Sequence, residues 1–310
     1  MKDDLIRKYS MLTAGSRVLC AVSGGADSMC LLHWLSELRE TYQITLFAAH
    51  YEHGLRGEES LRDAEFTKAQ CTDLGIPCVV EHGDVAAFAA SQRIGIEDAA
   101  RTMRYRFLEE TADKLGCERI ATAHNLNDNA ETVLMNLCRG AGTRGLAGIP
   151  PVRGRIIRPL LQTDRKEIEA YLDERGIDHI EDSSNYSDDY TRNRIRHQVI
   201  PLMEEENPSF LKSVGRMAEL VREDDACLCR EAEAFLREHR RENAIPAKPL
   251  LRLEPAVAAR VLRILCGSGL SMERTQALLL FAGGTERGVL EFPGGRVLRQ
   301  RGWLVFQGRN

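Results

Sequence analysis

The feature that most restricts the fold of this chain is an abrupt change from an apolar run to glycines and then to a helical pattern. Residues 18–22 are typical of a buried strand, and the loop Ser23-Gly24-Gly25-Ala26-Asp27-Ser28 follows directly. A helical repeat of leucines comes next, at Leu31, Leu32, Leu35 and Leu38. Two adjacent glycines let the backbone turn tightly and approach a ligand closely. The order strand, glycine turn, helix indicates an α/β protein with a ligand at the turn.

The loop 23–28 is predicted to bind phosphate. The amides of the first helical turn and the helix dipole both favour an anion there. Ser23 and Ser28 add hydroxyl donors, and Asp27 adds a carboxylate that can hold a divalent cation beside phosphate oxygens. An ordinary glycine turn is the alternative, but the serines and the aspartate favour phosphate binding. A Walker A loop is excluded, because no lysine follows the glycines.

The first two-thirds of the chain alternates between strand and helix patterns. We expect strands over 17–22, 44–50, 77–81, 119–123 and 156–158, with helices over 27–40, 58–74, 96–115 and 127–139. Strands separated by helices form right-handed crossovers, so the sequence predicts an α/β fold with a doubly wound parallel sheet. Ligands of such sheets bind beyond the carboxyl ends of the strands.

The pattern changes near residue 204. The polar, proline-flanked stretch 201–208 predicts a break, and helical patterns follow over 210–240, 250–270 and 272–281. The segments 288–292, 296–299 and 303–306 predict a small antiparallel sheet. We therefore expect a catalytic domain over residues 1–204 and a second, mainly helical domain over 205–310 that ends in a β-meander.

Composition narrows the class of protein further. The chain has 310 residues, a net charge of −4 and nine cysteines, most of them single within apolar segments, which favours reduced thiols over a disulfide framework. No apolar run is long enough to span a membrane, and the charged N-terminus lacks a signal-peptide pattern. We expect a cytoplasmic protein that does not bind membranes. A homodimer is compatible with the sequence, which does not determine the oligomeric state.

Polar residues also follow the other expected strands. His50 and His53 follow the second strand, and His124 and Asp128 follow the fourth. A histidine pair can bind metal, but no third ligand is near it, and hydrogen bonding is as common a role. Asp128 can cap a helix. It can also complete a Mg²⁺ site with Asp27, which would neutralise the charge of bound phosphate groups.

Basic residues gather in two places. Arg101 and Arg104 share one helix face, with ion pairs to Glu97 or Asp98 as the alternative to a role in binding. The stretch 139–166 carries seven basic residues against one acid, Asp164. Such a patch can neutralise RNA phosphates even on an acidic protein, or it can be a solvated loop.

These motifs together resemble known families. The loop Ser23–Ser28 is similar to the PP-loop of the N-type ATP pyrophosphatases, which cleave ATP between the α and β phosphates. Residues 18–200 resemble, in order, the tRNA(Ile)-lysidine synthetase family. The further motifs that carry this resemblance are His-x-x-His-Gly-Leu-Arg from His50, Ala-Arg-x-x-Arg-Tyr from Ala100, Thr-Ala-His-x-x-x-Asp-x-x-Glu-Thr from Thr122, and Arg-Asn-Arg-Ile-Arg-His from Arg192. Asn125, Asn127 and Asn129 stand where that family often has His, Asp and Gln.

The resemblance implies a ligation in two steps. ATP, with Mg²⁺, would adenylate the C2 carbonyl oxygen of the wobble cytidine in a tRNA(Ile) with a CAU anticodon. Free L-lysine would then displace AMP to form lysidine. It assigns ATP binding to Ser23, Gly24, Gly25, Ala26, Asp27 and Ser28, and Mg²⁺ to Asp27 and Asp128. It assigns catalysis to Asp27, Asp128, Arg101, Arg104 and Arg196. Contacts with tRNA would come from the second domain and from His50, His53, Arg56, Arg139, Arg144, Arg192 and Arg194.

Two alternatives stay open. The first is another PP-loop enzyme, such as a tRNA thiolase or a glutamine-dependent amidotransferase. A thiolase generally needs cysteine pairs beside the site, and Cys30, Cys71, Cys78 and Cys138 do not show that spacing. An amidotransferase would need a glutaminase domain, for which no segment remains. The second alternative is a nucleotide-binding and RNA-binding module without catalytic activity.

Overall fold

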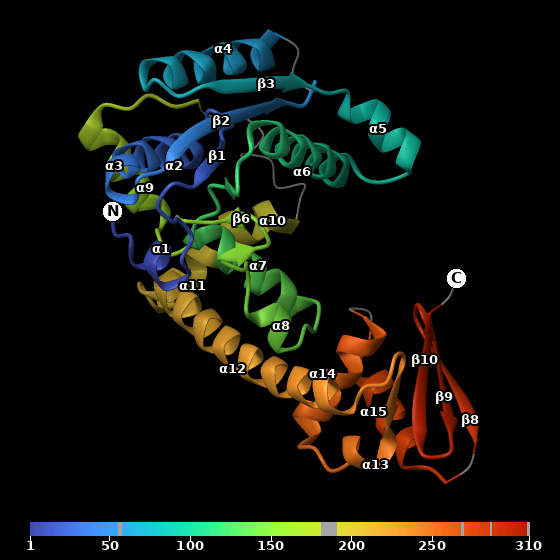
Figure 1. Ribbon diagram of the computed structural model, residues 1–310. Coiled ribbons are helices and arrows are strands. Elements are labelled where there is room, and N and C mark those ends of the chain that lie inside the picture. The colour runs from blue at the N-terminus through green and yellow to red at the C-terminus, as the bar shows by residue number, and fades with distance from the viewer. Residues whose placement is uncertain (55–57, 181–190, 268–269, 286, 309–310) are drawn as a thin grey trace. The chain divides into compact units, whose positions relative to one another are not determined.

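The computed structural model describes residues 1–54, 58–180, 191–267, 270–285 and 287–308 (Figure 1). It divides into two compact units, Met1–Ala218 and Glu219–Asn310. The division falls within helix α12 (Phe210–His239), beyond the expected position at residue 204. Most of the stretch 201–208, where a break was predicted, belongs to α11 (Ile200–Glu206), and the helices are interrupted only over residues 207–209. Pro201 lies in the first turn of this helix, where a missing N–H costs no hydrogen bond.

The first unit contains a six-stranded sheet in the order β3-β2-β1-β4-β6-β5. Its strands are β1 (Arg17–Ala21), β2 (Thr45–Glu52), β3 (Cys78–His82), β4 (Arg119–Ala121), β5 (Val152–Arg153) and β6 (Ile156–Ile157). All neighbouring strands are parallel except β5, which pairs antiparallel with β6. The predicted doubly wound parallel sheet is confirmed. The antiparallel edge strand was not predicted, because β5 and β6 form a hairpin too short to show a period.

The helices predicted for this unit are present. They are α2 (Ala26–Glu37) followed by the short α3 (Arg39–Tyr42), then α4 (Glu58–Asp73), α6 (Ile96–Leu115) and α7 (Leu126–Cys138). The sequence reading did not predict α1 (Asp4–Lys8), α5 (Val85–Gln92), α8 (Thr143–Leu146) and α9 (Arg165–Arg175). After residue 190 the chain continues as α10 (Thr191–Arg194) and a π-helical turn (Ile195–Val199).

Side chains of the central strands alternate between two cores. Val18 and Cys20 of β1 pack with α2 and α9 on one face, and Leu19 packs with α6 on the other. Because both faces are covered, the central strand reads as an unbroken apolar run, as expected for a buried parallel strand. The two layers of helices are visible around the sheet in Figure 1.

The strand order creates a crevice at the carboxyl end of β1. β1 has β2 on one side and β4 on the other, so the connections that leave these strands diverge. A doubly wound sheet binds its ligands at such a point. The loop 23–28 begins two residues after β1 ends, and the segment 122–128 follows β4. The fold therefore brings together motifs that lie about a hundred residues apart in the sequence.

The second unit is helical and ends in a sheet, as predicted. It contains most of α12, then β7 (Ala244–Pro246), α13 (Ala247–Leu250), α14 (Pro255–Cys266), α15 (Met272–Gly283), β8 (Gly288–Phe292), β9 (Gly295–Gln300) and β10 (Trp303–Gly308). The antiparallel order is β7-β10-β9-β8, so the last three strands form the expected meander. Val261, Val297 and Leu304 lie in its separate apolar core.

Two expectations from composition can be compared with the structure. All nine cysteines are described and none is in a disulfide, which agrees with reduced thiols. Across the described ranges, no helix is both long enough and apolar enough to cross a membrane.

The first prediction concerns the core beneath the crevice. Leu35 of α2 is fully buried, whereas Leu137 of α7 is 57% exposed. Leu35→Ala should lower the free energy of unfolding by about 2–5 kcal/mol, through lost burial and a cavity. Leu137→Ala should change it by about 0.5 kcal/mol or less. Urea unfolding of both variants tests this, and equal losses would contradict the assigned core.

Candidate active site

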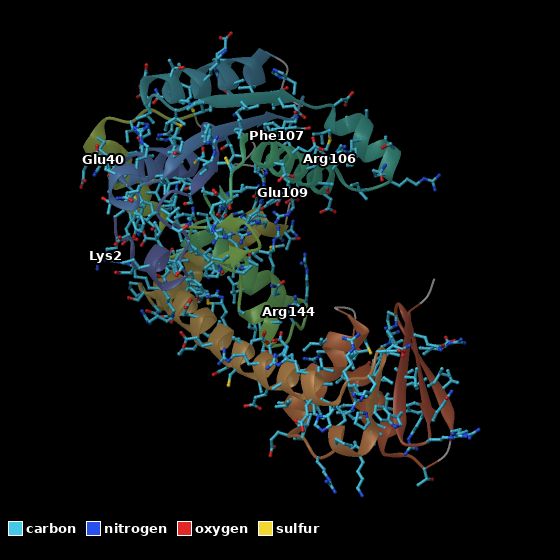
Figure 2. All side chains as sticks on the ribbon, viewed as in Figure 1. Lys2, Glu40, Arg106, Phe107, Glu109 and Arg144 are labelled. Atoms are coloured by element: carbon cyan, nitrogen blue, oxygen red, sulfur yellow. The ribbon has the colours of Figure 1, made fainter. Side chains whose placement is uncertain are left out.

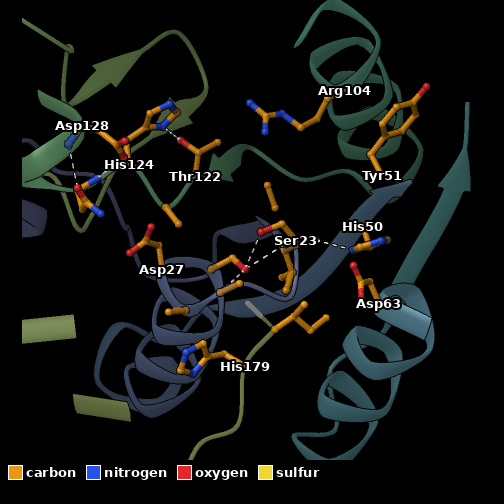
Figure 3. A pocket seen from close by; sticks show the side chains of 18 of the residues that line it. Ser23, Asp27, His50, Tyr51, Asp63, Arg104, Thr122, His124, Asp128 and His179 are labelled. Atoms are coloured by element: carbon orange, nitrogen blue, oxygen red, sulfur yellow. Dashed lines mark hydrogen bonds between the residues drawn. The ribbon is translucent and has the colours of Figure 1, made fainter. Parts of the chain in front are cut away.

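The crevice contains a cavity of about 1190 Å³, lined by residues of the first unit. Its walls come from the ends of β1, β2 and β4, the loop 23–28, and residues of α6, α7, α9 and the segment 192–197. Pockets for single small ligands are usually about 300–1,000 Å³. This cavity therefore has room for a nucleotide together with part of a second reactant. Figure 3 shows its labelled side chains converging from several elements.

The loop 23–28 is held in shape by its own hydroxyl groups. The Ser23 N–H donates to Ser28 Oγ at 3.1 Å, and Ser28 Oγ donates to the Gly25 carbonyl at 2.9 Å. Gly24 has a φ of +90°, which favours glycine. A Cβ at Gly24 would lie 2.6 Å from Cδ1 of Ile180, whose N–H donates to the Gly24 carbonyl. The glycine is thus needed both for the turn and for close packing.

Asp27 lies at the start of α2 and forms an ion pair within the cavity. Its Oδ1 is 3.0 Å from Nη1 of Arg165, which begins α9. Burial raises the pKa of Asp27, the Arg165 guanidinium opposes that shift, and the nearby Asp128 carboxylate adds to it. Two carboxylates therefore approach each other in the cavity, as Figure 3 shows.

Asp128 has the capping role that was one of its two expected functions. Its Oδ2 accepts a hydrogen bond from the Asn125 N–H at 3.1 Å, and Asn125 Oδ1 accepts from the Asp128 N–H at 3.0 Å. This is a capping box at the N-terminus of α7. The other oxygen, Oδ1, lies 3.4 Å from Arg192 and 3.5 Å from Arg196. The cap thus leaves one carboxylate oxygen among the basic residues that line the cavity.

Glu131 organises two of the cavity arginines. Its side chain is fully buried, and its two carboxylate oxygens each lie 2.6 Å from a guanidinium Nε, one of Arg192 and one of Arg196. Burying a carboxylate is costly unless it is paired in this way. Glu131 was identified as part of the motif that begins at Thr122, but its ion pairs were not predicted. Its position one helical turn after Asp128 is the signal that would have placed it on the same face.

His124 is held neutral at the end of β4. Its Nδ1 lies 3.1 Å from Thr122 Oγ1. Burial lowers the pKa of His124 well below 6.5, and the guanidinium groups of Arg158, Arg104, Arg101 and Arg192 lower it further. At neutral pH its imidazole therefore stays neutral and can accept a hydrogen bond.

Arg101 and Arg104 project from α6 into the same cavity. Within the described residues neither forms an ion pair, so the predicted alternative of ion pairs with Glu97 or Asp98 is not observed. Burial lowers the pKa of Arg104, and the neighbouring Arg101 lowers it further. Arginine nonetheless stays cationic, because its ordinary pKa lies far above neutral pH. Arg104 is seen reaching toward the cavity in Figure 3.

Only some of the residues expected to contact tRNA lie in the cavity, and the others lie elsewhere on the first unit. His50 and His53 line the cavity, but His50 is buried and its Nδ1 lies 3.0 Å from the Val22 carbonyl, which favours support of the loop. Arg139 and Arg144 are exposed and lie outside the cavity lining, as does Arg194. Figure 2 labels Arg144 near α8. Arg56 lies outside the described residues.

Several cavity residues were not predicted for lack of a sequence signal, among them Arg165 and Asp63. Arg165 was counted only within a basic stretch, yet it forms the ion pair with Asp27. Its backbone N–H donates to Asn127 Oδ1 at 3.0 Å, which joins the starts of α7 and α9. Asp63 of α4 also lines the cavity. Neither residue lies in a motif, and only the tertiary fold brings it to the site.

The comparisons with known proteins agree with this geometry. Residues 1–203 match a family model described as the PP-loop domain, so the chain belongs to the PP-loop family, whose domain binds ATP. It is also similar to tRNA(Ile)-lysidine synthases. Identity to that of Thermosipho africanus is 43% over 221 residues, or 71% of this chain and 52% of the relative. The tRNA(Ile)-lysidine synthase of Geobacillus kaustophilus is 38% identical to this chain over 268 residues, which cover 84% of this chain and 58% of the relative.

These similarities have defined limits. The chain spans about half the length of the curated relatives it matches. Among solved structures, it resembles the U34-tRNA thiolase NcsA from Methanococcus maripaludis with a TM-score of 0.60 and 20% identity. That match covers 71% of this chain and 78% of the thiolase. A likeness at this identity shows a shared fold alone.

The second prediction separates close packing of the loop from backbone strain. Gly15 and Gly24 have φ values of +81° and +90°, but a Cβ at Gly15 would meet nothing within 4 Å. Both alanine variants should lose about 1–2 kcal/mol of unfolding free energy through the left-handed backbone. Gly24→Ala should lose about 1–3 kcal/mol more through its clash with Ile180, and should also weaken ATP binding. Urea unfolding and calorimetric titration with ATP measure both effects; indistinguishable variants would contradict the packing.

The third prediction concerns pH. Because the pKa of His124 is depressed in the folded state, the unfolded chain binds more protons than the folded chain just below pH 6.5. The folded state therefore loses stability as the pH falls, by up to about 1.4 kcal/mol per pH unit from this group. His124→Gln should lose less stability than wild type between pH 7.5 and pH 5.5 in urea unfolding. Parallel losses would show that His124 does not titrate in this way.

Proposed function

We propose that this protein ligates lysine to C2 of the wobble cytidine in a tRNA(Ile) with a CAU anticodon, through an adenylated cytidine. The observation that carries the proposal is the cavity itself: the loop 23–28, the carboxylates of Asp27 and Asp128, His124 and five arginines line one space at the crevice. The names of the relatives and their identity of about 40% support the same substrate.

The loop 23–28 would hold the phosphates of ATP. Its glycines let the backbone approach, and the N-terminus of α2 favours an anion at the turn. Attack by the cytidine C2 oxygen on the α phosphorus would form the P–O bond of the adenylate and break the bond to pyrophosphate. Arg101 and Arg104 from α6, with Arg192 and Arg196 across the cavity, would stabilise the negative charge that builds up on the phosphoryl oxygens.

Asp27 and Asp128 fit a Mg²⁺ site of the kind that ATP brings with it. Mg²⁺ usually takes one or two carboxylates, with phosphate oxygens and water supplying the other ligands. The described residues contain no cluster of three or more acidic, histidine or cysteine ligands, which suits a cation shared with a substrate. When bound, Mg²⁺ would neutralise charge on the departing pyrophosphate.

The second step needs a neutral amine. Lysine carries an ammonium group at neutral pH, so its nitrogen must lose a proton before it attacks C2 and the C2–O bond to AMP breaks. That proton would pass to water, because burial and the surrounding arginines make His124 a weak base, and the neutral imidazole would instead accept a hydrogen bond from a reactant in the cavity. An acid could hold an ammonium group of lysine in place, and Glu131 is engaged by Arg192 and Arg196, whereas Glu97 lines the cavity. We therefore favour Glu97 as the partner of lysine.

A thiolase activity is the second candidate, because the fold is shared with a tRNA thiolase. Sulfur transfer and cluster binding both use cysteine thiolates. Among the described residues that line the cavity, none is a cysteine. This observation favours the ligase over the thiolase.

The fourth prediction tests the proposed activity. With ATP, Mg²⁺, labelled lysine and tRNA(Ile) bearing a CAU anticodon, pyrophosphate release should depend on the tRNA. The RNA should gain the mass of lysine less water. Asp27→Asn should lower the rate about 10²-fold or more, the scale seen when one electrostatic contact to a transition state is lost.

Asp4→Asn is the matched control, because Asp4 is 71% exposed on α1 and lies outside the cavity. It should retain wild-type turnover. Binding of ATP and tRNA without pyrophosphate release would instead favour the non-catalytic module. Sulfur incorporation in place of lysine would favour the thiolase.

A further inference from the structure

Three arginines gather around one aromatic ring beside the cavity. The guanidinium carbons of Arg101, Arg104 and Arg153 lie 5.0, 5.6 and 5.5 Å from the centroid of the Tyr105 ring. These distances are within the range of cation–π attraction, about 6 Å. Arg101, Arg104 and Tyr105 come from α6, and Arg153 comes from β5. We call these four residues the Tyr105 cluster.

The charge of the Tyr105 cluster is not neutralised. Within the described part of the chain, none of its three arginines forms an ion pair. A fourth guanidinium, Arg158, is 2% exposed and donates to the Pro150 carbonyl at 2.6 Å. Burial lowers the pKa of Arg158 and Tyr105 opposes that shift, while the guanidinium groups of Arg153 and Arg101 lower the pKa further, as expected for cations that repel one another.

Neighbouring arginines on the same elements behave differently. Arg155 of the β5–β6 hairpin pairs with Glu109 and Asp113, and Arg106 of α6 pairs with Glu110. Figure 2 labels Arg106 and Glu109 on α6. The protein thus neutralises adjacent arginines and leaves the Tyr105 cluster cationic. Fixed cations without counter-charges are a preorganised binding site for an anion.

The position of the cluster indicates which anion it takes. Arg101 and Arg104 line the cavity, whereas Arg153 is exposed and lies outside the cavity lining. The cluster therefore extends from the wall of the cavity to the surface. A nucleotide held by the loop 23–28 would occupy the cavity alone. A polynucleotide with one base in the cavity would carry its next phosphates past Arg153.

We propose that Tyr105 holds Arg101, Arg104 and Arg153 as a binding site for the phosphodiester backbone that flanks the nucleotide in the cavity. This inference rests on the proposed function, since it requires an RNA substrate. Stacked guanidinium groups keep their N–H edges available for phosphate oxygens, which they bind in a bidentate manner. Tyr105 is a positioning residue here, because it acts through the arginines.

The fifth prediction measures RNA binding by Arg153→Ala over a range of salt concentrations, without ATP or lysine. The probe is tRNA(Ile) with a CAU anticodon. Loss of one phosphate contact should weaken binding and lower the slope of log K against log salt by about 0.7–0.9. The KM for ATP should stay at the wild-type value.

Arg106→Ala is the charge-matched control. Arg106 is 75% exposed, pairs with Glu110 and lies outside the cavity lining, so its loss should leave the salt slope unchanged. An unchanged slope for Arg153→Ala would overturn the proposal, as would equal effects of the two variants. A higher KM for ATP with unchanged RNA affinity would also overturn it, since the cluster would then serve the nucleotide.

Two substitutions of Tyr105 test the role of its ring. Tyr105→Phe keeps the aromatic face and should retain the RNA affinity and salt slope of wild type. Tyr105→Leu removes that face and should reproduce the loss seen for Arg153→Ala, with thermal unfolding followed to show that the variant is folded. Equal affinity of the Phe and Leu variants would overturn the positioning role. A Leu variant that fails to fold leaves Arg153→Ala and Tyr105→Phe as the deciding pair.

The outcomes separate this proposal from the proposed activity. Wild-type protein that binds RNA through the cluster but never releases pyrophosphate would contradict the ligase and support the cluster. Wild-type protein that makes lysidine, with RNA affinity unaffected by Arg153→Ala, would contradict the cluster and support the ligase.

Discussion

The central place of β1 in the sheet is the constraint on which the site depends. Because β1 lies between β2 and β4, the chain segments that leave these strands diverge and leave room for a ligand. The loop 23–28 enters this room from β1, and His124 enters it after β4. The apolar side chains of β1 pack into two cores, one on each face of the sheet, and this packing fixes the register of the strand. The loop 23–28 and His124 are therefore positioned by the packing of apolar side chains that take no part in the chemistry.

Charges in the cavity are arranged in two ways. Asp27 with Arg165, and Glu131 with Arg192 and Arg196, are paired within the protein. Arg101 and Arg104 have no such partners among the described residues. The paired arginines are already oriented by carboxylates, and the unpaired ones add uncompensated positive charge. The unpaired arginines therefore attract a polyanionic reactant, and the paired arginines offer it hydrogen-bond donors that are already oriented. Binding then requires little reorganisation of these side chains.

The sequence predicted the architecture better than the details of the site. The strand, loop and helix around Gly24 were predictable because glycines, serines and leucines act there through local geometry. The pairing of Glu131 with Arg192 was not, because a helical glutamate does not reveal a partner 61 residues away. The proline-flanked stretch 201–208 was expected to interrupt the chain, yet it is helical up to Glu206, since proline is compatible with the first turn of a helix. Asp128 was predicted with two roles: the structure shows the capping role, and its second carboxylate oxygen lies beside Arg192, whereas Mg²⁺ binding stays a prediction.

The hydrogen bond from the Arg165 N–H to Asn127 Oδ1 has a consequence for substitutions at residue 127. A second bond, from the Leu126 N–H to the Thr163 carbonyl at 2.9 Å, joins the same two segments. Asn127 contributes one side-chain oxygen to this junction, and aspartate could supply the same acceptor. An Asn127→Asp substitution should therefore leave the spacing of the two carboxylates, Asp27 and Asp128, unchanged. Exchange of these two residue types at a helix junction changes local charge while leaving the scaffold intact.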